Sequence, residues 1–118
     1  MKKTLVAIFE DDLVNRYIYE KMFRQREDIT LHIFDHPEKG IQAFKETPFD
    51  VIFIEAHFRE NFGGIGILKQ LKPLVGSHTV FIAMTSLLQK GDLERLMGAG
   101  FMMCLEKPIV FNEIIDRI

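Results

Sequence analysis

The sequence predicts a single α/β domain in three layers, with a five-stranded parallel sheet covered by helices on both faces. Short apolar runs alternate along the chain with segments in which apolar residues recur at three- and four-residue spacing. These are the patterns of buried strands and of amphipathic helices. Several runs are apolar at consecutive positions, as expected for strands covered on both faces. Five strands alternating with five helices give a doubly wound sheet, and right-handed crossovers favour the strand order 2-1-3-4-5.

The predicted elements alternate from the start of the chain to its end. The apolar runs expected to form strands are residues 4–9, 30–34, 51–54, 80–84 and 102–105. The helix stripes between and after them are Val14, Ile18 and Met22; Ile41 and Phe44; Ile67, Leu68 and Leu71; Leu93, Leu96 and Met97; and Ile114, Ile115 and Ile118. Pro37 suits the first turn of the second helix, with Asp35 or His36 as its cap. Residues 73–77 and 98–100 are predicted as the loops that end the third and fourth helices.

The composition limits both the domain organisation and the class of partner. A length of 118 residues makes one domain, residues 1–118, and the last predicted helix is so short that we expect the front part of a longer protein. A net charge of -2 gives no electrostatic reason to expect binding to nucleic acid or to a membrane. The single cysteine, Cys104, cannot form an internal disulfide, and no apolar run is long enough to span a bilayer. A cytoplasmic location is therefore expected.

Charged residues follow three of the predicted strands at the point where each strand ends. Glu10 and Asp11 follow the first, Glu55 the third and Lys107 the fifth. The carboxyl ends of parallel strands meet at one edge of the sheet, where such folds bind ligands. Three carboxylates about 5 Å apart repel by roughly 3 kcal/mol per pair at an effective dielectric constant near 20, so a cation is needed. Mg²⁺ and Lys107 are the two candidates, and solvated loop acids are the simpler alternative.

The same segments argue against a nucleotide site. The turn after the first strand, Glu10-Asp11-Asp12, repels an anion where dinucleotide-binding folds place glycines. Residues 63–66, Gly-Gly-Ile-Gly, match neither the P-loop nor the dinucleotide fingerprint. A small enzyme or ligand-binding protein on this fold is the least favoured of the functions considered.

The chain resembles a response regulator receiver domain, which has a flavodoxin-like fold, over essentially its whole length. The motifs that carry the resemblance are Phe9-Glu10-Asp11-Asp12 with Asn15 and Arg16, Phe49-Asp50-Val51-Ile52, Gly64, Thr85-Ser86, Ala99-Gly100 and Lys107-Pro108-Ile109. The resemblance implies a bacterial two-component phosphorelay, with a sensor histidine kinase or another signalling protein as partner. It also implies Mg²⁺ ligands at Glu10, Asp11, the phosphoacceptor position 55 and the backbone carbonyl of His57, and phosphate contacts or switch roles for Thr85, Ser86 and Lys107. No catalytic residue is assigned, because receivers are signalling modules rather than enzymes.

The phosphoacceptor position is where the sequence departs most from the family, because it holds Glu55 in place of aspartate. The additional methylene moves the carboxylate by up to about 1.5 Å, and a misplacement near 1 Å can reduce an oriented reaction roughly a hundredfold. In the family, glutamate at this position often imitates the phosphorylated form by extending a negative group towards the lysine. The resemblance therefore implies that Glu55 reaches Lys107 or Thr85 and does not turn over phosphate. The result would be a pseudo-receiver that acts by protein–protein interaction, with Mg²⁺ binding weak or absent. A functional Mg²⁺-dependent phosphoacceptor is the alternative.

Other departures lie beside the pocket. Residues 56–64 are about one residue longer than usual, and Arg59 is a competing cation there. Cys104 replaces the aromatic residue that in the family moves with the Thr85 position, and it is expected to pack as a small apolar side chain. A transition-metal site at His57 and Glu55 is a weaker interpretation, since imidazole and carboxylate suit zinc or iron. Pairing of two copies through the fourth helix, fifth strand and fifth helix is a further expectation drawn from the family.

Overall fold

The computed structural model, which describes residues 3–59 and 63–117, contains a five-stranded parallel sheet in the order β2-β1-β3-β4-β5. The predicted strand order is therefore confirmed. In chain order the elements are β1 (Thr4–Phe9), α1 (Leu13–Phe23), β2 (Ile29–Phe34), α2 (Pro37–Phe44), β3 (Val51–Glu55), α3 (Gly63–Leu71), a 3₁₀ turn η1 (Lys72–Leu74), β4 (Val80–Thr85), α4 (Asp92–Ala99), β5 (Met103–Glu106) and α5 (Phe111–Asp116).

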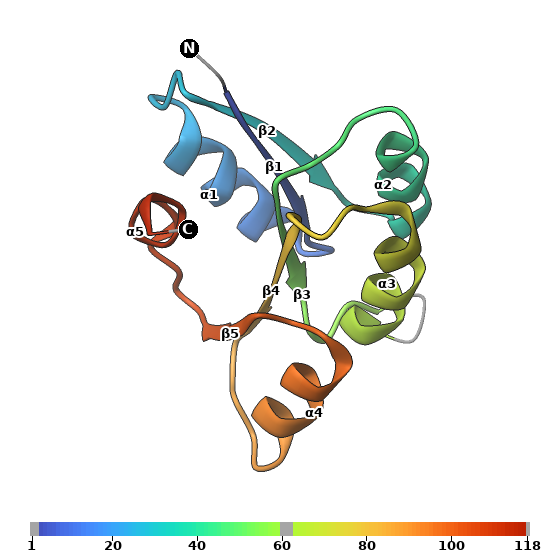
Figure 1. Cartoon of the computed structure of the whole chain (residues 1–118). Helices are drawn as coiled ribbons and strands as arrows, with labels where there is room; N and C mark the ends of the chain where they lie inside the picture. The colour runs from blue at the N-terminus through green and yellow to red at the C-terminus, as the bar shows by residue number, and fades with distance from the viewer. Residues whose placement is uncertain (1–2, 60–62, 118) are drawn as a thin grey trace.

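Two hydrophobic clusters, one on each face of the sheet, form the core. Helices α1 and α5 cover one face and α2, α3 and α4 the other, as Figure 1 shows. The alternation of strand side chains divides the sheet between the clusters, so that Ile8 packs under α1 and α5 while Phe9 packs under the opposite layer. The central strands β1 and β3 are almost fully buried, which explains their consecutive apolar residues.

The strand ends differ from the predicted ones by at most one residue, and two of these differences affect the site. Strand β3 extends to Glu55, which pairs with Met84, and β4 extends to Thr85. Both residues are thus the last members of their strands and not the first residues of loops. Their backbones are fixed by the sheet, so their side chains start from well-defined positions.

The stripe predicted for the first helix is wrong as a core face. Val14 and Ile18 are 64% and 41% exposed, and Met22 is 39% exposed. The residues of α1 that reach the core are Tyr19 and Phe23, which pack around Phe111 of α5. The three-residue and four-residue spacing was correct for a helix, but two faces satisfied it and the aromatic face is the buried one.

Smaller predictions concern the helix ends. His36 occupies the N-cap of α2 and Pro37 its first turn, although the His36 side chain makes no capping hydrogen bond. Gly98 lies inside α4, which ends at Ala99 with Gly100 as its cap at a φ of 124°. The expected loop therefore begins later than predicted. Ile118, placed in the last helix stripe, and residues 60–62 of the lengthened segment lie outside the described residues.

Candidate functional site

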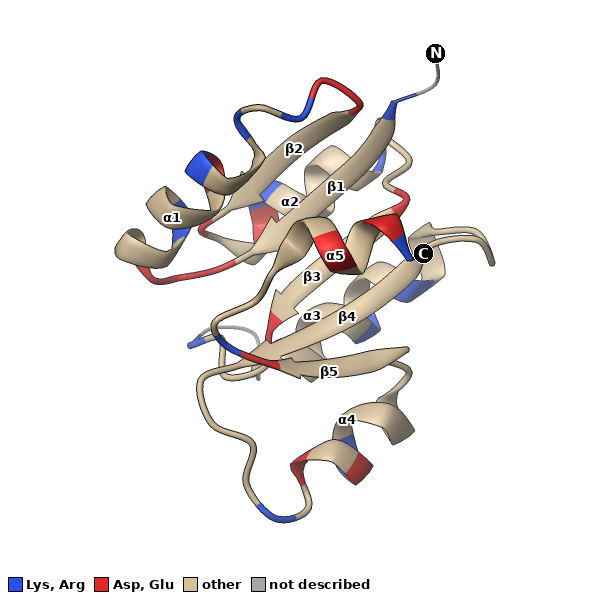
Figure 2. Cartoon of the chain, turned by 90° about the vertical axis from the view of Figure 1, so that its left-hand side faces the viewer, with Lys and Arg blue, Asp and Glu red and all other residues tan. Residues whose placement is uncertain are grey.

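A cluster of charged side chains lies at the carboxyl edge of the sheet, where β1, β3 and β5 end. Figure 2 shows acidic residues at the end of β3 and in the segment after β1, with a basic residue just after β5. These are Glu10 and Asp11 after β1, Glu55 at the end of β3 and Lys107 after β5. The topology places β1 beside β3 at the centre of the sheet and β5 at its edge, so the long Lys107 side chain must reach inwards to meet the acids.

Lys107 joins two buried carboxylates. Its ammonium nitrogen lies 2.6 Å from Oε1 of Glu10 and 2.5 Å from Oε1 of Glu55. The side chains of Glu10, Glu55 and Lys107 are only 1%, 8% and 12% exposed. Because water is largely excluded, the two ion pairs must compensate the cost of removing three charges from solvent. Glu55 reaches Lys107, as the sequence predicts.

Backbone groups satisfy the remaining carboxylate oxygens. The His57 amide donates to Oε2 of Glu55 at 2.8 Å, and the Asp12 amide donates to Oε2 of Glu10 at 3.3 Å. Among the described residues, every buried polar side-chain atom has a hydrogen-bond partner. Both oxygens of Glu55, the position where a phosphoryl group would be accepted, are therefore already engaged.

The electrostatic balance of the cluster favours a charged lysine. Burial disfavours the ammonium form, but hydrogen bonds and charges from Glu10 and Glu55 outweigh it and raise the pKa of Lys107 well above its usual value. Burial raises the pKa of Glu10, while the hydrogen bond and charge of Lys107 oppose the rise and the neighbouring Glu55 charge adds to it. Lys107 thus acts as an internal counter-ion.

Asp11, the other member of the acidic pair, contacts Arg59. Its Oδ2 accepts the Arg59 amide at 3.0 Å and lies 3.6 Å from the Arg59 guanidinium Nε. Arg59 is the competing cation expected from the sequence. Its side chain is 84% exposed, so this pair is weak by itself, but the backbone hydrogen bond fixes the direction in which Asp11 points.

The carboxylates of the cluster are paired with positive groups of the chain itself. In residues 3–59 and 63–117, no group of three or more His, Cys, Asp or Glu side chains is positioned to hold a metal ion. Glu10 and Glu55 face the Lys107 ammonium, and Asp11 faces Arg59. A divalent cation would have to displace Lys107 and Arg59 before the three carboxylates could coordinate it. At His57, where zinc or iron was the weaker interpretation, the group that contacts Glu55 is the backbone amide.

The proposed phosphate-contacting residues are not all directed at the triad. The Thr85 hydroxyl is fully buried and donates to the Leu87 carbonyl at 3.1 Å, while the Leu87 amide lies 3.3 Å from the same oxygen. Ser86 is exposed. Cys104 is partly buried against the core cluster, and burial raises the pKa of its thiol, which fits the packing role expected for it. Of the two candidate partners for Glu55, the contact is with Lys107.

Tyr19 is a site residue that the sequence did not indicate. Its hydroxyl lies 3.0 Å from Oε1 of Glu10, and the ring is buried beneath α1. The available signal was a tyrosine among apolar helix residues, because a buried tyrosine hydroxyl usually needs a polar partner. The stripe of Val14, Ile18 and Met22 predicted the wrong buried face of α1, so Tyr19 was not identified as a buried residue.

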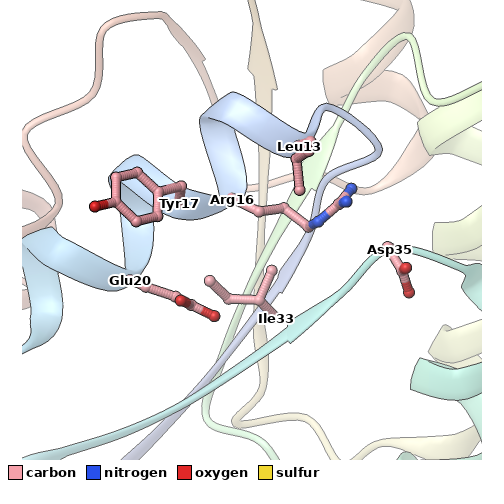
Figure 3. A pocket seen from close by; sticks show the side chains of 6 residues that line it. All are labelled: Leu13, Arg16, Tyr17, Glu20, Ile33 and Asp35. Atoms are coloured by element: carbon pink, nitrogen blue, oxygen red, sulfur yellow. The ribbon is translucent and has the colours of Figure 1, made fainter.

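A second feature lies apart from the charged cluster, between α1 and β2. Figure 3 shows a cavity there lined by Leu13, Arg16, Tyr17, Glu20, Ile33 and Asp35. Five apolar side chains on α1 are also well exposed, namely Leu13, Val14, Tyr17, Ile18 and Met22.

The described residues contain no helix with the length and apolar character needed to cross a membrane.

A five-stranded parallel sheet with acids after β1 and at the end of β3 and a lysine after β5 places the chain in the receiver class of α/β proteins. The profile of the response regulator receiver domain matches residues 6–118. The chain therefore belongs to the response regulator receiver domain family, as the sequence motifs indicate. No match was found among curated proteins.

Solved structures agree with this assignment at the level of the fold. One similar chain is the receiver domain of the Saccharomyces cerevisiae response regulator Ssk1, crystallised with the histidine phosphotransfer protein Ypd1. It shares 20% identity and a TM-score of 0.81, over 99% of this chain and 87% of that one. The receiver domain of the Pseudomonas aeruginosa sensor histidine kinase PA1611, with a magnesium ion in its active-site cleft, shares 19% identity and a TM-score of 0.78. That match covers 98% of this chain and 93% of that one.

A third similar structure, a response regulator from Burkholderia pseudomallei, contains a phosphorylated aspartic acid, a calcium ion and citrate. It shares 14% identity and a TM-score of 0.82, over 96% of this chain and 65% of that one. The chain thus spans about two thirds of that protein. Two of these three relatives hold magnesium in the cleft or phosphate on an aspartate, whereas this chain has Glu55 at the phosphoacceptor position and its Lys107 is paired with Glu55.

Proposed function

We propose that this chain is a pseudo-receiver of two-component signalling, in which phosphorylation is lost or greatly weakened and output depends on protein–protein interaction. The observation that carries the proposal is the Lys107 ammonium, 2.5 Å from Glu55 and 2.6 Å from Glu10. In this arrangement the cation that the acids require is part of the chain. The Glu55 carboxylate forms an ion pair with Lys107 without any phosphoryl group. This ion pair holds the domain in one signalling state.

The geometry of Glu55 supports lost phosphorylation in two ways. Its longer side chain moves the carboxylate from the place an aspartate would hold by up to about 1.5 Å. Its two oxygens also contact Lys107 and the His57 amide, so a phosphodonor would have to break both contacts before attack. With Asp11 turned to Arg59, we expect Mg²⁺ binding to be weak or absent, and the domain to have no enzymatic activity of its own.

The switch residues support the same proposal. The Thr85 hydroxyl is held by Leu87, and Cys104 offers no aromatic ring to move with it. A conformational signal that depends on a threonine and an aromatic residue has no counterpart here. The domain would therefore act on its partner through a constant binding surface. It would not depend on a conformational change caused by phosphorylation.

The exposed apolar side chains indicate where a signalling partner would bind. The α1 side chains and the adjacent cavity (Figure 3) suit a protein partner such as a sensor histidine kinase or another signalling protein, and the Ssk1 receiver was crystallised with such a protein. A second group of exposed apolar residues, Leu87, Leu93, Met97, Met102 and Val110, lies on or beside α4, β5 and α5. That group supports pairing of two copies through these elements. Direct contact with nucleic acid or membrane is not proposed, and we expect a cytoplasmic location.

Phosphorylation of the intact domain tests the proposal. The wild type, Glu55→Asp and Glu55→Gln are incubated with Mg²⁺ and a small phosphodonor, and the intact mass is measured. We expect no modification of the wild type and a single base-labile phosphoryl group on Glu55→Asp, with Glu55→Gln as the control that lacks a carboxylate at this position. Stoichiometric modification of the wild type that disappears in Glu55→Gln would overturn the pseudo-receiver proposal in favour of a working phosphoacceptor.

A further inference from the structure

Tyr19 is placed to control the direction of the Glu10 side chain. The ring is 4% exposed and lies edge-on to Phe111 of α5, with ring centres 5.0 Å apart. Phe111 also packs against Phe53 and Phe23, so the tyrosine ring is held in an aromatic cluster between α1, α5 and the sheet. From this fixed position the hydroxyl lies 3.0 Å from Oε1 of Glu10.

Glu10 is held by more groups than its neighbour in the acidic pair. Its Oε1 contacts both the Tyr19 hydroxyl and the Lys107 ammonium, and its Oε2 contacts the Asp12 amide. Asp11 is held only through Arg59 among the interactions found in the described residues. The direction of Glu10 is therefore fixed from the interior of the domain, through the Tyr19 hydroxyl.

We infer that Tyr19 is a positioning residue that holds the Glu10 carboxylate on Lys107 and so keeps it from acting as a divalent-cation ligand. The inference rests on the proposed pseudo-receiver function, because the Tyr19 contact would explain why Glu10 and Asp11 do not coordinate a cation. A hydrogen bond to a charged group changes an equilibrium by at least about tenfold. To bind Mg²⁺, Glu10 would have to give up the contacts with Tyr19 and Lys107.

The test uses Glu55→Asp as background, because the shorter acid releases Lys107 and leaves space for an ion. Mg²⁺ alone is titrated by calorimetry into Glu55→Asp, Tyr19→Phe/Glu55→Asp and Tyr17→Phe/Glu55→Asp. Tyr19→Phe removes only the hydroxyl and keeps the ring, and Tyr17 is an exposed tyrosine of the same helix that has no contact with Glu10. We expect Mg²⁺ to bind about tenfold more tightly when Tyr19 is replaced, and with unchanged affinity when Tyr17 is replaced.

A spectroscopic measurement keeps the inference testable if the Tyr19→Phe protein does not fold. The chain has two tyrosines and no tryptophan, so Tyr19 is the sole source of tyrosine emission in Tyr17→Phe/Glu55→Asp. A carboxylate that accepts the phenolic hydrogen quenches this emission, and Mg²⁺ should increase it as Glu10 turns away. Equal Mg²⁺ affinities with and without the Tyr19 hydroxyl, including no binding by either protein, would overturn the inference. So would Mg²⁺ binding that leaves Tyr19 emission unchanged. Failure of the proposed function is seen separately, as phosphorylation of the wild type.

Discussion

At the scale of single residues, the main feature is one lysine shared by two buried acids. A receiver pocket concentrates negative charge at the end of the sheet, and this charge needs a counter-ion. Here Lys107 is that counter-ion, because the Glu10 and Glu55 side chains both place a carboxylate oxygen next to its ammonium group. The two glutamates, Glu10 and Glu55, are therefore paired with the same lysine. Their carboxylate oxygens lie 2.6 Å and 2.5 Å from the same ammonium nitrogen.

The first prediction concerns the loss of this lysine. Lys107→Met leaves Glu10 and Glu55 buried without their counter-ion, and such a change typically costs about 3–5 kcal/mol of unfolding free energy. The variant should be less stable by roughly this amount at pH 7 in chemical denaturation. Lys69→Met, which replaces an exposed lysine of α3, is the matched control and should change stability by less than about 0.5 kcal/mol.

The same variant has a pH dependence whose sign follows from Glu10. Burial already raises the pKa of Glu10, and Lys107 opposes the rise, so the pKa should rise further when the lysine is absent. A carboxyl with a raised pKa in the folded state favours folding below its unfolded pKa and loses that contribution as the pH rises through the folded pKa. The stability deficit of Lys107→Met should therefore be small near pH 4 and grow towards pH 7. A deficit that is equal at both values would contradict the counter-ion role.

At the scale of elements, the close approach of α3 to the end of β3 determines where Glu55 sits. A Cβ on Gly64 would lie 2.7 Å from the Glu55 carbonyl oxygen and 2.9 Å from the Ala56 Cα. Both neighbours are backbone atoms that cannot rotate away. The first turn of α3 is therefore packed directly on the strand end that carries the acid, and the Gly64 amide also donates to the Ala56 carbonyl at 3.0 Å.

This packing predicts opposite effects for two glycine substitutions. Gly64→Ala should destabilise the domain by about 1–3 kcal/mol, the range for overpacking, and should disturb the Glu55 to Lys107 contact. Gly98→Ala should stabilise it by about 0.5–1 kcal/mol, because Gly98 lies within α4 and a Cβ there meets no atom within 4 Å. Urea denaturation of both variants measures the difference. Equal effects would show that the β3–α3 approach does not constrain the strand end.

At the scale of the whole molecule, the sequence predicted those features that follow from periodicity and from the topology of parallel sheets. The sequence predicted that Glu10, Glu55 and Lys107 lie close together. Each of them follows or ends a buried strand, and parallel strands end at one edge of the sheet. The resemblance to receiver domains predicted that Glu55 reaches Lys107 or Thr85, and the contact in the structure is with Lys107.

What the sequence did not predict depends on tertiary packing. Which face of α1 is buried was not decided by Val14, Ile18 and Met22, because α5 returns beside α1 and its Phe111 selects the aromatic side. The contact of Tyr19 with Glu10 follows from that choice, as does the exposure of the apolar stripe. The direction of the Thr85 hydroxyl likewise depends on the loop that carries Leu87, whose path has no periodic signal.

The central claim is that the Lys107 ammonium occupies the place of the cation and is held by Glu10 and Glu55. The most direct test is nuclear magnetic resonance of the Lys107 ammonium group in the wild type, with and without millimolar Mg²⁺. We predict a slowly exchanging ammonium signal that changes in Glu10→Gln and in Glu55→Gln and is unaffected by Mg²⁺. A Lys107 signal that exchanges rapidly with water, or that Mg²⁺ shifts in a saturable manner, would contradict the account.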